Sequence, residues 1–171
     1  MSDKLNSPQQ RRLHKMIQIA LDRSAAALKI MLGGKIKIGL VRAPLQTPGI
    51  CVRLGLSGDL KGDIYIDLPE KMAVEIVKTL TAGDELSLLD EAARSALMEM
   101  GNILASVFVG YFDQHHGLRT LPMPPEFSLA PIDIPIYAEY FTAEFFWGQS
   151  LERAGVLIGL ERSALDILFP K

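Results

Sequence analysis

Residues 87–112 read SLLDEAARSALMEMGNILASVFVGYF, and their pattern predicts one long amphipathic helix. Ser87 and Asp90 have the spacing of a capping box at its start. Apolar residues recur at helical spacing, so one stripe of the helix should face a core. The members of this stripe are Leu89, Ala93, Leu97, Met100, Leu104, Val107 and Tyr111. His115, His116 and Gly117 should form the turn that follows.

A polar ridge lies on the opposite side of this predicted helix. Its members are Glu91, Ser95, Glu99, Asn102 and Ser106. The polar face of an amphipathic helix is most often simply solvated. Asn102 argues against that reading, because asparagine is a poor residue for a helix interior. The neighbouring Gly101 lowers helix stability by ~1 kcal/mol relative to alanine. We therefore expect Gly101 to leave room for a partner to approach the ridge closely.

The remaining sequence predicts elements in two similar series. The first has a helix at 9–31 that stops at Gly33-Gly34, strands at 35–41, 50–56 and 63–68, and a helix at 69–80. The second has the helix at 87–112, strands at 136–146 and 155–160, and a helix at 163–169. Between them, 121–135 holds five prolines and should be irregular or edge-like.

This order predicts weak internal symmetry within a single domain, 1–171. The two repeats should span about 9–82 and 87–171. The expected fold class is α+β, with an antiparallel sheet and the long helices packed on one side of it.

Composition excludes several classes of function. Formal net charge is −2 and the basic residues form no stripe, so nucleic acid is not expected as a partner. Cys51 is the one cysteine, and the histidines at 14, 115 and 116 do not make a ligand set, so no metal site is predicted. The first dozen residues are polar, and the longest apolar run, 103–112, is short for a membrane span. We therefore expect a cytoplasmic protein without membrane insertion.

The ridge carries a recognisable motif. Ser95, Glu99 and Asn102, in SALMEMGN, are followed by the pair Pro124-Pro125. This pattern resembles the signature of the CheC/CheX/FliY family of chemotaxis phosphatases, and the resemblance extends from about residue 13 to residue 169. It implies a CheC-like fold with a pseudo-twofold repeat. It also implies hydrolysis of the aspartyl phosphate of a CheY-type response regulator in bacterial chemotaxis.

The resemblance implies a role for each residue of the motif, and the chemistry of the side chains agrees with it. An aspartyl phosphate is an activated acyl phosphate, so a catalyst need only place a water in line with phosphorus. The carboxamide of Asn102 has both donors and an acceptor for that task. Glu99 would dock on the lysine beside the regulator's phosphate. Ser95 and Pro125 would shape the ridge and its neighbouring loop. The chain needs no cofactor of its own, and any Mg²⁺ would be supplied by the response regulator.

The N-terminal helix predicts how many sites the protein has. CheC-type proteins resemble a tandem duplication and often carry a second copy of the motif on their first helix. Here the equivalent ridge has Arg11, Lys15, Gln18 and Asp22. Lys15 replaces the acid and Gln18 replaces the asparagine, so this first site should be inactive. Lys15 would also place like charges together. The chain is therefore expected to be closest to CheC, with only its second site retained.

Two other functions stay open at this point. A non-catalytic adaptor of the same family would bind the phosphorylated regulator or the receptor deamidase CheD. A flagellar switch component like FliY ranks third, because that type carries an additional C-terminal domain. The sequence does not identify the regulator, and it leaves open whether CheD binds, whether the protein is a monomer or a dimer, and whether the N-terminal ridge has a function.

Overall fold

The computed structural model describes residues 5–42, 49–83, 86–130 and 132–171. These residues form four helices and one antiparallel sheet of seven strands, which confirms the predicted α+β class. The helices are α1 (Ser7–Leu32), α2 (Glu70–Leu80), α3 (Glu91–His116) and α4 (Arg162–Leu168). The strands are β1 (Ile36–Val41), β2 (Ile50–Gly58), β3 (Gly62–Leu68), β4 (Thr120–Pro122), β5 (Glu126–Ser128), β6 (Glu139–Trp147) and β7 (Arg153–Leu160).

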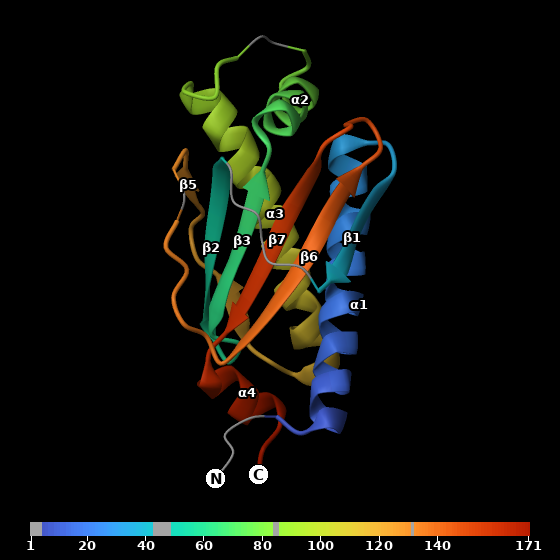
Figure 1. Ribbon diagram of the computed structural model, residues 1–171, viewed down its shortest axis with the longest axis vertical. Helices are drawn as coiled ribbons and strands as arrows, with labels where there is room; N and C mark the ends of the chain where they lie inside the picture. The colour runs from blue at the N-terminus through green and yellow to red at the C-terminus, as the bar shows by residue number, and fades with distance from the viewer. Residues whose placement is uncertain (1–4, 43–48, 84–85, 131) are drawn as a thin grey trace.

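The long helices α1 and α3 lie against one face of the sheet, as predicted, while α2 and α4 lie at its two ends (Figure 1). Every second residue of the central strands points at these helices. The core on this side includes Val52 and Leu54 from β2 and Ile64 and Ile66 from β3. By length and composition α3 could cross a membrane, but half of its most apolar window is buried inside the fold.

The strand order ties the two halves of the chain together. The order is β1-β6-β7-β3-β2-β4, with β5 also paired to β2. The hairpin of β2 and β3 therefore takes its outer neighbours, β4 and β5, from the second half of the chain. The hairpin of β6 and β7 takes its outer neighbour, β1, from the first half. This symmetric order is what a duplication would produce, and the repeat boundaries at 9–82 and 87–171 stay a prediction.

Helix α3 begins and ends later than the sequence indicated. The Asp90 carboxylate accepts a hydrogen bond from the Ser87 backbone N–H at 2.8 Å, and the Ser87 hydroxyl accepts one from the Leu89 N–H at 3.2 Å. These bonds form a turn before the helix, so the predicted capping box does not start it. Leu89 consequently lies outside the apolar stripe and is exposed. At the other end, the two predicted turn histidines are the last helical residues, and Gly117 ends the helix with φ of 65°.

Gly101 has a different role from the one expected. A Cβ at this position would lie 2.8 Å from Cγ1 of Val52 and 3.2 Å from Cδ1 of Leu54. The glycine therefore allows α3 to approach the sheet closely, and the space beside it is filled by β2. The expectation that this space admits a partner was wrong, because Gly101 lies on the buried side of α3.

The proline-rich segment forms the edge of the sheet, as predicted. Strands β4 and β5 are both short and both pair with β2. Proline lacks a backbone N–H and is therefore tolerated on an edge strand. Pro131, the fourth of the five prolines, lies outside the described residues.

Candidate functional site

An open cleft of about 500 Å³ lies between α3 and the β4–β5 edge of the sheet. Its lining residues are Ser95, Met98, Glu99 and Asn102 from the helix and Pro122, Met123, Pro124 and Pro125 from the edge. The four residues that the sequence singled out, Ser95, Glu99, Asn102 and Pro125, thus lie around one cleft. Met98 and Met123 were not predicted. Met98 lies next to Glu99 on α3, but no feature of the sequence marked either methionine.

Helical spacing explains how α3 presents its part of the site. Residues four and seven positions apart lie on one face, so Ser95, Glu99 and Asn102 form a continuous ridge. Ser95 and Glu99 are exposed, whereas Asn102 is half-buried. Within the part of the chain that the structure describes, neither the Glu99 carboxylate nor the Asn102 carboxamide is hydrogen-bonded to another residue. Both groups are therefore available to a partner.

A bulge in the edge strand makes the opposite wall of the cleft. On β2, Leu56 pairs with Pro122 and Arg53 pairs with Glu126. Three residues, 123–125, therefore lie opposite only two, Leu54 and Gly55. Such an extra residue bends the strand locally and is common beside active sites. The Met123 N–H donates to the Gly55 carbonyl at 2.7 Å, while the two prolines that follow have no N–H to pair.

A second contact joins the wall to the start of α3. The Arg94 guanidinium lies over the Phe127 ring of β5, 5.4 Å from its centroid, a cation–π geometry. Arg94 directly precedes Ser95 on the helix, and Phe127 follows the bulge by two residues. The two walls of the cleft are thus joined at one end by their own side chains.

The corresponding ridge on α1 is arranged differently. Gln18 donates from Nε2 to the Ile38 carbonyl at 3.0 Å and accepts at Oε1 from the Leu40 N–H at 2.8 Å. Nε2 also donates to Asp22 at 2.8 Å. The carboxamide of Gln18 is therefore used to bind the backbone of β1, unlike that of Asn102. Lys15, one turn earlier, is exposed. That this ridge is inactive stays a prediction.

Other titratable groups lie on the far side of the sheet. Cys51 is buried, and burial together with the nearby Asp67 raises the pKa of its thiol to about 12, so the thiol stays protonated at neutral pH. Burial also raises the pKa of Asp67 to about 6. In residues 5–42, 49–83, 86–130 and 132–171, no three histidine, cysteine, aspartate or glutamate side chains are grouped to hold a metal ion.

Comparison with known proteins gives a consistent set of similarities. The family model CheX, described as chemotaxis phosphatase CheX, matches residues 50–130, a segment that includes the whole cleft. A CheX structure from Desulfovibrio desulfuricans has a TM-score of 0.73 and 14% identity, over 86% of this chain and 99% of that one. FliY from Thermotoga maritima has a TM-score of 0.73 and 16% identity, over 96% of each chain.

A third similar structure contains a partner. It is the complex of CheX with CheY, BeF₃ and Mg²⁺ from Borrelia burgdorferi, with a TM-score of 0.68 and 24% identity, over 85% of this chain and 97% of that one. At such identities the structures establish a common fold with this chain.

Proposed function

We propose that this chain, which belongs to the CheC/CheX/FliY family of chemotaxis proteins, hydrolyses the aspartyl phosphate of a CheY-type response regulator. The predicted family is confirmed, while the closer relation to CheC stays a prediction because the matching family model is that of CheX. One observation carries the proposal. Asn102 and Glu99 lie in one cleft, with side chains that bond to none of the described residues, inside the segment that matches the phosphatase family model.

In this proposal Asn102 positions the attacking water. Its carbonyl oxygen accepts a hydrogen bond from the water, which directs a lone pair of the water oxygen at phosphorus. The new P–O bond forms as the bond between phosphorus and the aspartate oxygen breaks, and the electrons of that bond return to the carboxylate. The protons of the water end on inorganic phosphate and solvent. A neutral amide suits this task because it adds no charge beside the phosphoryl group.

Glu99 is proposed as the docking residue. It lies one turn before Asn102 and is exposed, so a regulator's active-site lysine can reach it when the ridge enters the phosphorylation pocket. A charge-assisted hydrogen bond there would fix the distance between Asn102 and phosphorus. Ser95 extends the same ridge, and Pro125 lies on the facing wall. We propose that these two residues shape the cleft and take no part in the chemistry.

The response regulator supplies the metal in this scheme. The complex of CheX with CheY also contains BeF₃ and Mg²⁺, and that composition supports a magnesium-dependent regulator as the partner here. Because such regulators are cytoplasmic proteins, the proposal also places this chain in the cytoplasm. The ridge of Lys15 and Gln18 is proposed to be inactive, which leaves one site per chain.

The test is the decay of a phosphorylated CheY-type regulator from the host, with and without this protein. We expect the native protein to accelerate decay and Asn102→Ala to lower that acceleration at least about tenfold, because the water is no longer oriented. Ser106→Ala is the matched control, since Ser106 is exposed one turn further along the same ridge and does not line the cleft. It should keep native activity.

Two results would contradict the proposal. If the native protein accelerates the decay of none of the host's regulators, the chain is not a phosphatase, and an adaptor that binds the phosphorylated regulator or CheD takes its place. If Asn102→Ala folds normally and keeps full activity, the reaction takes place elsewhere. Circular dichroism and the thermal midpoint of each variant establish that it is folded.

A further inference from the structure

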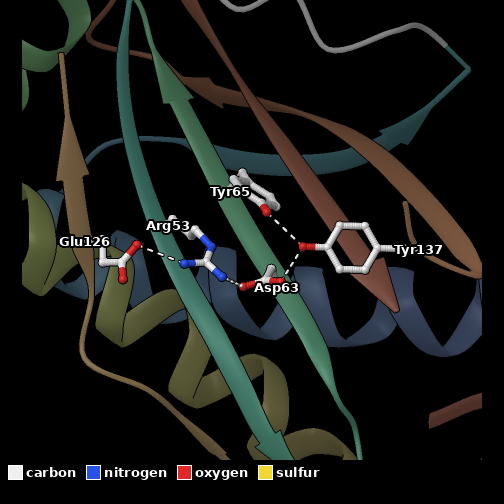
Figure 2. A network of polar contacts seen from close by, with 5 residues as sticks. All are labelled: Arg53, Asp63, Tyr65, Glu126 and Tyr137. Carbon is white, nitrogen blue, oxygen red and sulfur yellow. Dashed lines mark hydrogen bonds and ion pairs between the residues drawn. The ribbon is translucent and has the colours of Figure 1, made fainter. Parts of the chain in front are cut away.

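Five polar side chains form a continuous network on the face of the sheet opposite α1 and α3 (Figure 2). They come from three strands and from the segment before β6. In the order of their contacts they are Glu126, Arg53, Asp63, Tyr137 and Tyr65. The network begins at β5, next to the bulge that walls the cleft, and ends on the central strand β3.

The inner part of the network consists of close contacts between mostly buried side chains. Arg53 contacts Asp63 at 2.8 Å through Nη2, and Tyr137 donates a hydrogen bond to the other carboxylate oxygen of Asp63. The Tyr65 and Tyr137 hydroxyls are 2.8 Å apart. Asp63, Tyr65 and Tyr137 are all buried. Burial lowers the pKa of Arg53, but its bonds to Glu126 and Asp63 raise it by more, so the guanidinium stays charged.

The outer end of the network is different. Glu126 contacts Nη1 of Arg53 at 2.9 Å, yet 67% of its side chain is exposed. It directly follows Pro125, the last residue of the bulge. Strand β5 is only three residues long, and the two prolines before it cannot donate to β2. Few backbone bonds therefore hold this part of the edge, and the ion pair supplies a fixed attachment to the inner sheet.

We propose that Arg53 and Glu126 are positioning residues that hold the proline bulge at a fixed place opposite Asn102. A cleft whose two walls are already in place loses less freedom when the regulator binds. This inference rests on the proposed function, because it assigns the network to the binding of that same substrate. Neither residue lines the cleft, so both act through Pro125 and its neighbours.

Two variants separate positioning from general stability. Glu126→Ala removes the outer carboxylate, and Glu126→Gln keeps an oxygen that can accept from Arg53. An exposed ion pair contributes little to global stability, so neither variant should shift the thermal midpoint. The matched control is Glu144→Ala, which breaks the exposed ion pair with Arg153 at the same distance, 2.9 Å, on a part of the sheet that does not contact the cleft.

The first readout does not depend on enzymatic activity. The Met123 amide, bonded to the Gly55 carbonyl, reports on the bulge by hydrogen exchange. Glu126→Ala should raise the exchange rate of the Met123 amide about two- to fivefold, the size of effect that an exposed ion pair can have. The rate in Glu126→Gln should lie between those of Glu126→Ala and the native protein. Glu144→Ala should leave this exchange unchanged. Unchanged exchange in Glu126→Ala, or an equal increase in the control, would overturn the proposal.

The second readout is the kinetics of dephosphorylation. Glu126→Ala should raise the KM for the phosphorylated regulator about two- to fivefold with little change in kcat, because Asn102 itself is untouched. An unchanged KM beside an active native protein would overturn the proposal. If the native protein is inactive, the proposed function fails, and the exchange experiment alone decides whether the ion pair holds the bulge.

Discussion

Asn102 and Gln18 carry the same chemical group at places that the predicted repeat makes equivalent, and their surroundings differ. The Gln18 carboxamide binds the Ile38 carbonyl and the Leu40 N–H, much as a peptide group of a neighbouring strand would. The Asn102 carboxamide lies beside a bulge whose prolines offer no N–H. The Asn102 side chain is thus one methylene shorter than that of Gln18, and the two prolines beside it offer no backbone N–H. The Gln18 amide is bonded to a sheet edge, whereas the Asn102 amide is left for a ligand in the proposed function.

The proposed docking role of Glu99 can be tested by removing the charge of its side chain. Glu99→Gln keeps the shape of the side chain and removes its charge, so we expect the regulator to bind about two- to tenfold more weakly at low salt. Salt screens the native contact, so the difference between the proteins should shrink as ionic strength rises. The measurement is the affinity for a BeF₃-activated regulator at two salt concentrations. Glu91→Gln, an exposed acid at the start of the same helix, is the control, and an equal loss there would refute a specific role for Glu99.

Asp67 gives a prediction about pH. Burial raises its pKa to about 6, partly offset by a hydrogen bond from the Gly49 backbone N–H. The folded protein therefore binds this proton more tightly than the unfolded chain, so ionisation of Asp67 lowers stability as pH rises from about 4 to about 7. Relative to the native protein, Asp67→Asn should gain up to about 3 kcal/mol of unfolding free energy over that interval and nothing further above it.

Urea unfolding at several pH values measures this difference directly. A difference between Asp67→Asn and the native protein that stays constant from pH 4 to pH 7 would show that Asp67 titrates normally in the folded state.

At the level of elements, periodic patterns were sufficient to place most of the fold and the ridge. The apolar and polar faces of α3 follow from spacing alone, and the i, i+4, i+7 positions of Ser95, Glu99 and Asn102 follow with them. The start of the helix could not be placed, because Ser87 and Asp90 satisfy a turn as well as a capping box. The pairing of β1 with Gln18 depends on contacts between distant segments, which periodicity does not encode.

Gly101 is a second position where a contact between distant segments could not be read from the sequence, and the contact can be tested by mutation. Sequence context suggested space for a partner, whereas the sheet fills that space through Val52. Gly101→Ala should destabilise the protein by about 1–3 kcal/mol from overpacking, reduced by the ~1 kcal/mol gain in helix propensity. Gly110→Ala on the same helix is the matched control, because beyond the adjoining helix backbone no described atom lies within 4 Å of its added Cβ, and it should be neutral or stabilising.

The free energy of unfolding in urea measures both glycine variants. Adding Val52→Ala to Gly101→Ala should recover part of the loss if the Val52 methyl is the obstacle, which makes the two changes non-additive. Equal stabilisation by the two alanine substitutions would contradict the close approach of α3 to β2.

At the level of the whole molecule, the exchange of outer strands explains why the cleft needs both halves of the chain. All of its lining residues lie between 95 and 125, in the second half. The bulge that forms one wall nevertheless pairs with β2, and Gly101 packs on β2, both contacts with the first half. A motif confined to some thirty residues therefore has its geometry set by residues about fifty positions earlier.

This interdependence predicts the behaviour of fragments split after residue 85, between α2 and α3. Fragment 1–85 leaves β1 without its partner β6, and fragment 86–171 leaves β4 and β5 without β2. Neither fragment should show a cooperative thermal transition, because each exposes unpaired strand edges and half of a shared core. An equimolar mixture should show one transition, below that of the intact chain and rising with concentration. Circular dichroism on the mixture, and on each fragment at twice the concentration, measures this. Cooperative unfolding of 86–171 alone would mean that the second half forms the site without the first.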